Sequence, residues 1–515
     1  MTDTFGHRPP APAIYQIYPR SFQDTTGSGV GDLAGITQRL DYVAGLGVDA
    51  IWLSPIYVSP MVDGGYDIID HSAIDPRFGT LDDFDALVAK AHDLGLAVYM
   101  DQVLNHTSDQ CPWFQDAIAG DAAKADWYLW RDPKPDGSPP NNWLSQFGLP
   151  GWHWNHKRRQ YYYAQFTASQ PSLNLRNPDV QATIARQMQG WRDRGVDGFR
   201  FDVVTSFLWD ESLKDNPPAT PEVQDKVSGE NFNPYTYQDH TYDMLPGDGA
   251  AYAQNLRKWT GDDAYLFGEN TSGNQSVALA MAFSEPGRLN ATYITDMPEG
   301  RGSPATFADL IARGADFQRL PGWLSSHDQP RHGAGDASDA VLALQMAFLP
   351  GPWIIYQGEE LGLPQPDLSQ HEVTDPLDLR YWPDGPGREG ARVPVPWNAD
   401  DEWFGFTDDC PWLPMRWDRD ALRRAWADGG MVDFYRRIIA LRRDLNWAEA
   451  EITDVTLEGD VFDMTITTGD AVRYRGIFTH GAAGPADRPR SDALISAEGV
   501  APDAAGWSGG VWRLS

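Results

Sequence analysis

The hydrophobic positions in the first half of the chain alternate between short apolar runs and stretches with one apolar helical face. Apolar residues recur at helical spacing from 33 to 46, and Gly47 follows them, which predicts a helix that ends at a glycine. Thr80 and Asp83 form the start of a second helix in the manner of a capping box. Continuous apolar runs between amphipathic helices predict a parallel sheet covered on both faces.

Eight such runs occur along the chain, at 13–18, 48–53, 96–103, 196–204, 264–267, 291–294, 323–325 and 353–356. Eight strands that alternate with helices predict an α/β fold, the (β/α)8 TIM barrel. The alternation of strands and helices stops after the third strand. The stretch that follows is rich in Trp, Tyr, Pro, Asn and Gly and is too long for an ordinary loop. The end of the chain alternates every second residue, which predicts an antiparallel β domain. The expected parts are the barrel in two pieces, 1–106 and 175–447, an inserted lobe at 107–174, and a C-terminal β domain at 448–515.

Composition excludes several classes of partner. The 515 residues carry a formal net charge of −32, and a surface this acidic repels nucleic acid and anionic membranes. No apolar run is long enough to cross a bilayer, and the first ten residues lack the basic start and apolar core of a secretory signal. We therefore expect a cytoplasmic protein whose two cysteines, Cys111 and Cys410, are free and buried. Its oligomeric state remains unknown at this point.

Polar side chains collect where the predicted strands end. They are Asp101, Asn105 and His106 after the third run, Arg200 and Asp202 at the end of the fourth, Glu269 after the fifth, and His327 with Asp328 after the seventh. A single aspartate after a strand is usually the N-cap of the next helix, but three carboxylates at three strand ends favour a catalytic site. Glycoside hydrolysis needs two carboxylates, one that attacks or activates water and one that protonates the leaving oxygen. This pattern alone indicates neither the sugar nor the role of each carboxylate.

At these positions the chain resembles glycoside hydrolase family 13, the α-amylase superfamily, in its α-glucosidase and oligo-1,6-glucosidase branch. Seven short motifs occur in the family's order, namely IYQIYPRSF, GYDI at 65–68, DQVLNH at 101–106, GFRFD at 198–202, FGEN at 267–270, SHDQPR at 326–331 and YQGEELGL at 356–363. The resemblance spans nearly the whole barrel. It implies a retaining, exo-acting hydrolase of small neutral glucosides that requires no cofactor for its chemistry.

The resemblance also implies catalytic roles. Asp202 would be the nucleophile that forms a covalent glucosyl intermediate, and Arg200 would keep it ionised by charge attraction. Glu269 would be the general acid/base. Asp328 would be the third catalytic carboxylate and, together with His327, would grip the sugar hydroxyls most effectively in the distorted transition state.

Three further residues would bind the substrate. By the same resemblance, His106 would hydrogen-bond the same sugar ring. Asp67 in GYDI and Arg388 in the segment GREGAR would bind the non-reducing-end 4-hydroxyl and close the pocket behind one glucose. The alternative for Arg388 is a surface arginine in a loop rich in proline and glycine. The enzyme is thus expected to act from chain ends on disaccharides and short oligosaccharides, and poorly on starch.

The linkage preference rests on two conflicting signals. Val203 follows the expected nucleophile, and in this branch valine there goes with α-1,6 cleavage, whereas alanine or threonine goes with α-1,4. The segment 215–218 (DNPP) resembles instead enzymes that favour α-1,4 disaccharides and transfer glucose. We favour α-1,6, and the alternatives are an α-1,4-preferring α-glucosidase with transglucosylation activity or a glucosyl isomerase of sucrose or maltose. A non-catalytic relative is disfavoured because all three carboxylates are present.

The loop at 24–32 (DTTGSGVGD) resembles the family's cation loop, but Thr26 and Ser28 stand where the family usually has asparagine and aspartate. A hard cation depends on oxygen ligands and negative charge, so these replacements weaken such a site. A structural Ca²⁺ or Mg²⁺ ion could still bind through Asp24, Asp32 and main-chain carbonyls.

Overall fold

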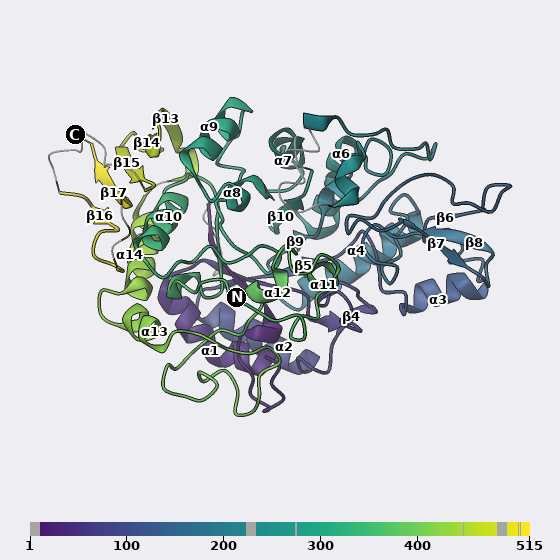
Figure 1. Cartoon of the computed structure of the whole chain (residues 1–515), viewed down its shortest axis with the longest axis horizontal. Coiled ribbons are helices and arrows are strands. Elements are labelled where there is room, and N and C mark those ends of the chain that lie inside the picture. The colour runs from purple at the N-terminus through teal and green to yellow at the C-terminus, as the bar shows by residue number, and fades with distance from the viewer. Residues whose placement is uncertain are drawn as a thin grey trace.

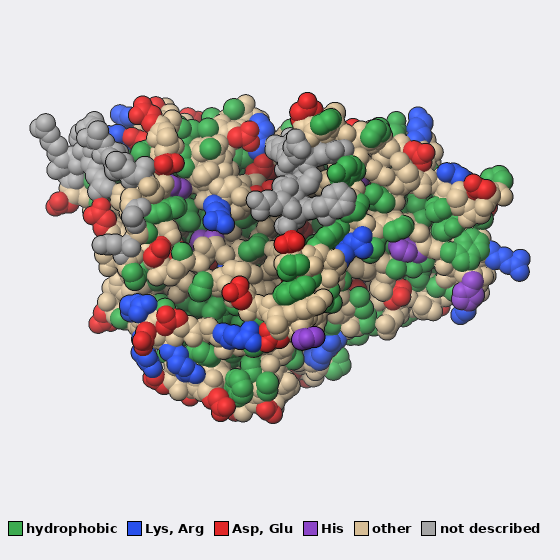
Figure 2. Space-filling view, in the orientation of Figure 1, with side chains coloured by type: hydrophobic (Ala, Val, Ile, Leu, Met, Phe, Trp, Pro, Cys, Tyr) green, Lys and Arg blue, Asp and Glu red, His purple; other side chains and the backbone are tan. Residues whose placement is uncertain are grey.

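The computed structural model describes residues 11–222, 233–272, 275–445, 447–481, 492–502, 504 and 506–514. The first ten residues, on which the secretory-signal argument rests, lie outside the described part. Within that part, no helix combines the length and the apolar character needed to cross a membrane. On the face shown in Figure 2, acidic, basic and apolar side chains are interspersed, so the acidic excess is spread over that face.

The centre of the molecule is a sheet of seven parallel strands in the order β11-β10-β9-β5-β2-β1-β12 (Figure 1). Every residue of these strands is buried, as expected for a sheet with both faces covered. The strands are β1 (Ala13–Ile17), β2 (Ala50–Leu53), β5 (Ala97–Gln102), β9 (Gly198–Phe201), β10 (Tyr265–Asn270), β11 (Ala291–Ile294) and β12 (Trp353–Tyr356).

The expected strand at 323–325 is not a strand, and this prediction was wrong. An irregular segment runs there beside β12, where the Gly322 amide donates to the Pro352 carbonyl and the Ile354 amide donates to the Gly322 carbonyl. Pro321, at the start of the segment, has no amide hydrogen, which works against regular strand pairing. The segment fills the eighth position around the barrel, so the (β/α)8 fold class is confirmed.

Two helices of the barrel, α1 and α2, lie where the sequence predicts them. The Asp32 carboxylate accepts a hydrogen bond from the Gly35 amide at the start of α1, and Gly47 ends that helix in the left-handed conformation. Thr80 and Asp83 form a reciprocal capping box on α2. The larger helices are α1 (Leu33–Leu46), α2 (Leu81–Asp93), α4 (Pro178–Asp193), α6 (Pro246–Thr260), α7 (Ser276–Phe283), α9 (Pro304–Ala312), α10 (Ala337–Ala347), α13 (Arg419–Trp426) and α14 (Met431–Asp444). The shorter ones are α8 (Asp296–Glu299), α11 (Pro376–Arg380) and α12 (Arg388–Ala391).

Two smaller sheets lie at opposite ends of the molecule, with the barrel between them (Figure 1). On the right in that view, beside α3 (Pro112–Ala119), is an antiparallel sheet of β6 (Trp130–Arg131), β8 (Gln160–Tyr163) and β7 (Trp152–Asn155). On the left is a five-stranded antiparallel sheet of β13 (Glu451–Glu458), β14 (Val461–Thr467), β15 (Arg473–Thr479), β17 (Ser508–Arg513) and β16 (Ile495–Ser496). A short hairpin of β3 (Tyr57–Val58) and β4 (Asp70–Ile74) follows β2. The first two sheets lie inside the ranges expected for the inserted lobe and the C-terminal domain.

Candidate active site

Strand register brings polar residues of neighbouring strands to one level at the C-terminal end of the barrel. Asp101 on β5 lies opposite Arg200 on β9, and Glu269 on β10 lies opposite Tyr293 on β11. Asp202 follows β9 directly. Because parallel strands of a barrel end around one opening, these side chains converge there.

Arg200 is the buried centre of this group. One guanidinium nitrogen, Nη1, lies 2.8 Å from Asp101 and 2.9 Å from Asp202, while Nη2 forms a short ion pair with Glu269. The Tyr293 hydroxyl accepts hydrogen bonds from Nε at 3.0 Å and from Nη2 at 2.8 Å. A single positive charge therefore faces three carboxylates.

This charge imbalance changes the ionisation of Asp202. Burial raises the pKa of Asp202 well above its usual value; Arg200 acts against this, and the charges of Glu269 and Asp101 add to it. Sequence reasoning considered only the attraction of Arg200. The structure differs because one arginine shared among three carboxylates does not offset burial and repulsion together.

Val203 has an unusual backbone conformation directly after Asp202. Its φ is +37°, in the left-handed region that a β-branched residue rarely adopts. Its amide donates to the Glu269 carboxylate at 3.3 Å. Its side chain belongs to a small apolar cluster with Phe147 and Phe166. The strained turn thus links the residue after Asp202 to Glu269 and places an apolar wall beside both.

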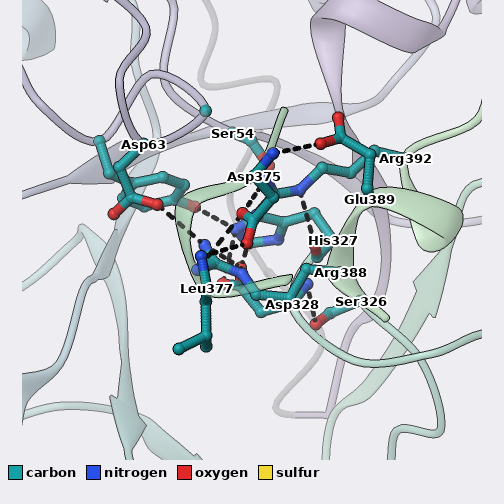
Figure 3. A network of polar contacts seen from close by, with 12 residues as sticks. Ser54, Asp63, Ser326, His327, Asp328, Asp375, Leu377, Arg388, Glu389 and Arg392 are labelled. Atoms are coloured by element: carbon teal, nitrogen blue, oxygen red, sulfur yellow. Dashed lines mark hydrogen bonds and ion pairs between the residues drawn. The ribbon is translucent and has the colours of Figure 1, made fainter. Parts of the chain in front are cut away.

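Asp328 lies in a second network of charged side chains, shown in Figure 3. Its Oδ1 lies 2.8 Å from Arg388 Nη2 and 2.9 Å from Arg392 Nη2, and its Oδ2 lies 2.9 Å from His327 Nε2. Burial acts to raise the pKa of Asp328, but His327, Arg388 and Arg392 outweigh it and hold that pKa well below its usual range. Asp375 supports both arginines, 2.9 Å from Arg392 Nη1 and 3.5 Å from Arg388 Nη1.

The orientation of His327 follows from its hydrogen bonds. The Gln16 side-chain amide lies 2.7 Å from Nδ1 of His327. An amide nitrogen only donates, so Nδ1 accepts and the proton of the neutral ring is on Nε2. Nε2 faces Asp328 and the Tyr66 hydroxyl, and the Tyr66 ring stacks on the imidazole with centroids 5.2 Å apart. His327 therefore presents a donor toward Asp328.

The structure does not bring Asp67 against Arg388. The Asp67 carboxylate accepts hydrogen bonds from one hydroxyl and two amides of its own loop, residues 59–63, at 2.9 to 3.1 Å. The carboxylate beside Arg388 is that of Asp63, which lies 3.3 Å from Arg388 Nη2 and accepts a hydrogen bond from Gln170 Nε2 at 2.9 Å. Arg388 itself is buried, so the alternative of a surface arginine is excluded.

His106 lies beneath this part of the site. Its Nε2 is 3.1 Å from the Tyr66 carbonyl oxygen and 3.1 Å from the side-chain nitrogen of Gln170. Burial lowers the pKa of His106 to about 3, so the ring is neutral at ordinary pH. Gln170 contacts both His106 and Asp63, so it ties the two together.

Several residues of the site were missed by sequence reasoning. They are Asp63, Tyr66, Gln170, Asp375 and Arg392. Tyr66 lies inside GYDI beside Asp67, and Arg392 lies inside GREGAR, which also contains Arg388. Asp63 stands two residues before GYDI. The signal for these three was therefore present, whereas nothing local marks Asp375.

The loop at 24–32 is organised by its own donors. Asp24 Oδ1 accepts from the Thr26 amide at 2.8 Å and the Thr26 hydroxyl at 2.9 Å, and Oδ2 accepts from the Gly29 amide at 2.8 Å and the Thr407 hydroxyl at 2.7 Å. Asp32 is engaged in the same way by Thr25 and caps α1. Across the described residues, no group of three or more His, Cys, Asp or Glu side chains is arranged to hold a metal ion. Hydroxyls and amides occupy the oxygens that a cation would need, so these residues do not fit a hard-cation site.

Cys410 lies on the segment that packs against this loop. The Trp412 amide donates to the Gly29 carbonyl, and the Cys410 backbone carbonyl lies where a Gly29 side chain would be. Both cysteines are free, as expected, but only Cys111 is buried. The prediction was wrong for Cys410 because its backbone, and not its thiol, faces the loop.

Chelation is expected to leave the stability of the protein unchanged. The Tm should be the same in EDTA and in millimolar Ca²⁺, since Asp24 and Asp32 already have full sets of donors. A double variant with Thr26→Asn and Ser28→Asp should gain a Ca²⁺-dependent rise in Tm, measured by scanning fluorimetry. A fall in the Tm of the unaltered protein on EDTA treatment would contradict this reading of the loop.

A barrel that gathers ionised and buried carboxylates around arginines at the ends of its strands has the layout of a glycoside hydrolase. The family described as "Alpha amylase, catalytic domain" matches residues 16–297 and 310–450. A probable α-glucosidase of Rhizobium meliloti (strain 1021) is 41% identical over 493 residues, which cover 89% of this chain and 86% of that protein. An oligo-1,6-glucosidase of Parageobacillus thermoglucosidasius is 32% identical over 506 residues, covering 89% and 88%.

Among solved structures, that of the α-glucosyl transfer enzyme XgtA superimposes with a TM-score of 0.88 at 36% identity, covering 99% of this chain and 98% of that one. The chain belongs to the α-amylase family of glycoside hydrolases, glycoside hydrolase family 13. The resemblance noted from the motifs is thereby confirmed at the level of the family and its α-glucosidase branch, and the protein is a glycoside hydrolase.

Proposed function

We propose that the protein is a retaining, exo-acting α-glucosidase that hydrolyses short neutral α-glucosides through a covalent glucosyl–Asp202 intermediate. The observation that carries this is the position of Arg200, whose one guanidinium contacts both Asp202 and Glu269. A shared guanidinium keeps the two carboxyl groups close, and retaining glycosidases need a separation of about 5–5.5 Å, whereas inverting enzymes leave room for a water between them.

The proposed reaction has two steps. Asp202 attacks the anomeric carbon while Glu269 gives its proton to the leaving oxygen, and the sugar becomes esterified to Asp202. Glu269, now a carboxylate, then takes a proton from a water that attacks the same carbon and frees Asp202. Asp328 stays ionised beside Arg388 and Arg392 and holds ring hydroxyls as positive charge develops on the sugar. None of these steps requires a metal or an organic cofactor.

The exo character is proposed to depend on Asp63 and Arg388. These residues form an ion pair, and Gln170 connects Asp63 to His106, so the group closes one end of the site with charged hydrogen-bonding partners. Such partners suit the hydroxyls at the end of a sugar chain. Small neutral glucosides fit this site. Nucleic acid and membranes are not proposed as partners, and the cytoplasmic location stays a prediction.

Asp63→Asn is expected to raise KM for maltose about tenfold to a hundredfold, because a charge-assisted hydrogen bond to a sugar hydroxyl contributes about 1.5–3 kcal/mol. Asp67→Asn is the matched comparison. It should lower Tm and leave KM nearly unchanged. Among the described residues, the hydrogen bonds of the Asp67 carboxylate go to its own loop. Steady-state kinetics and thermal melts of both variants provide the measurement. A large KM effect confined to Asp67→Asn would contradict the proposal for Asp63 and support Asp67, the residue expected from sequence.

The linkage preference is proposed to lean to α-1,6. Val203, Phe147 and Phe166 form an apolar wall beside Glu269, which shapes the space for the leaving group without adding a polar partner. Wall shape of this kind changes selectivity by about 1–3 kcal/mol. We expect a higher kcat/KM on isomaltose than on maltose, and about a tenfold shift toward maltose in Val203→Ala. A preference for maltose in the unaltered enzyme would defeat the proposal.

Glucosyl transfer is the second candidate, and the similarity to the α-glucosyl transfer enzyme XgtA favours it. The same covalent intermediate serves both reactions, since only the acceptor differs. Product analysis at high maltose or sucrose separates them. Oligosaccharides or a sucrose isomer formed faster than free glucose would identify a transferase or isomerase.

A further inference from the structure

A second polar hollow lies where the inserted lobe meets the barrel. Its volume is about 140 Å³. The lobe contributes β6 and the turn before β8, and the barrel side contributes the segment before α4 and the region after β9. The residues that line it and matter here are Trp130, Arg131, Arg158, Arg176, Trp209 and Gln160. None of them takes part in the site described above.

Three arginines face this hollow without an ion pair to a carboxylate. Among the residues that the structure describes, Arg131, Arg158 and Arg176 form no ion pair, although the chain has 73 acidic against 41 basic residues. Two acidic residues, Asp126 and Glu211, also line the hollow, but both are exposed, whereas the arginines are half-buried. Charge inside the hollow is therefore positive in a strongly acidic protein.

The hydrogen bonds that hold these arginines go to neutral acceptors. Arg131 Nη1 donates to the Trp130 carbonyl at 2.7 Å, and Arg176 Nη2 donates to the Trp209 carbonyl at 2.7 Å. Arg158 Nε donates to the Gln160 side chain at 2.8 Å, and its guanidinium lies 4.3 Å from the Trp130 ring centroid. The guanidinium groups are thus held by neutral acceptors, while the exposed carboxylates of Asp126 and Glu211 attract them only from beyond ion-pair distance.

Two buried donors at the same hollow lack an acceptor. In the described part of the chain, no acceptor lies within hydrogen-bond distance of Arg176 Nη1 or of Trp130 Nε1. Trp130 is only 5% exposed. A buried donor without a partner costs about 1–3 kcal/mol, and native proteins usually satisfy such groups. Each nitrogen has almost no exposed surface, so a ligand in the hollow would reach it only after the lining side chains shift.

We propose that this hollow is a binding site for a small phosphate oxyanion, either inorganic phosphate or the phosphate group of a sugar phosphate. The planar guanidinium fork matches the geometry of phosphate oxygens, and three guanidinium groups from different segments line the hollow. A water occupies about 30 Å³ of liquid, so the hollow has room for a phosphate group of several heavy atoms. The assignment is independent of the proposed glucosidase activity.

The site lies between the inserted lobe and the barrel, so binding of an anion there should stabilise the folded protein. Arg131 and Arg158 belong to the lobe, and Arg176 and Trp209 belong to the barrel side, so one bound anion joins the two. A ligand that binds only the folded protein shifts its unfolding to higher temperature in proportion to ligand excess. Phosphate should therefore raise Tm at constant ionic strength, beyond the effect of an equal concentration of chloride.

Calorimetric titration of the full chain with inorganic phosphate, at constant ionic strength, tests the proposal. A saturating glucosidase inhibitor of the iminosugar class is present, so that Arg200, Arg388 and Arg392 are blocked. We expect one site per chain with a Kd of about 1 mM, and about tenfold weaker binding for each of Arg131→Gln and Arg176→Gln. Arg159→Gln, an exposed position on the same turn as Arg158, is the matched control and should bind like the unaltered protein.

Titration with glucose 6-phosphate under the same conditions distinguishes the two sources of phosphate. Tighter binding of the ester identifies a sugar phosphate, and equal binding identifies free phosphate. Absence of a saturable heat, loss of binding when the iminosugar is added, or unchanged affinity in Arg131→Gln would each overturn the proposal. Arg131→Gln decides the question if Arg176→Gln does not fold, since Arg131 bonds only to the carbonyl next to it in the chain.

Discussion

Asp202→Ala is expected to lower kcat about 10⁴-fold or more on every α-glucoside, because Asp202 is the group proposed to form the glycosyl ester. The measurement is hydrolysis of p-nitrophenyl α-glucoside. The side chain removed leaves space beside the anomeric carbon, so added sodium azide should restore glucosyl release and form β-glucosyl azide. That product has inverted configuration, which only attack from the side of Asp202 can produce.

The folded state should tolerate this change. Burial and the charges of three neighbouring carboxylates raise the folded-state pKa of Asp202 above its unfolded value. A carboxyl group with a raised pKa contributes stability that is present at low pH and is lost as pH rises through the folded-state pKa. At neutral pH its removal should therefore leave Tm equal or higher, and Asp202→Asn should behave alike. Near-normal hydrolysis by a folded Asp202→Ala protein would refute the nucleophile assignment.

Glu269→Gln is expected to separate the two chemical steps. General acid catalysis contributes about 10²–10⁴-fold, so kcat/KM on maltose or isomaltose should fall by that amount. An activated aryl glucoside needs little acid assistance, and its first step should lose much less. The second step still lacks its base, so a burst of nitrophenol close to the enzyme concentration should precede slow turnover.

The matched control is Glu285→Gln, which removes the same charge from a surface ion pair with Arg288. It should leave kcat/KM on both substrates unchanged. Rapid-mixing kinetics with the aryl glucoside and steady-state kinetics with the disaccharides measure both effects. Equal losses on the two kinds of substrate, with no burst, would argue against Glu269 as the acid/base.

Much of the barrel follows from local signals. The Gly47 end of α1 and the capping box of α2 are set by neighbours within a few residues, so sequence reasoning located them. Strands β1, β2 and β5 are continuous apolar runs that have few alternatives in a soluble protein. The local signal is weak at 323–325, where only Trp323 and Leu324 are apolar, and Pro321 and Gly322 just before them do not support a strand.

The sequence by itself determined the α/β barrel, its family, and the strand ends that carry Asp202 and Glu269, because strand periodicity and short motifs can be recognised along the chain. Only the tertiary structure decided which charges meet. Asp63, and not Asp67, faces Arg388, because the turn at 59–63 directs the Asp67 carboxylate to its own backbone. The raised pKa of Asp202 was equally beyond local reasoning. It arises from burial and from carboxylates on two other strands, whose distance depends on sheet register and not on spacing along the chain.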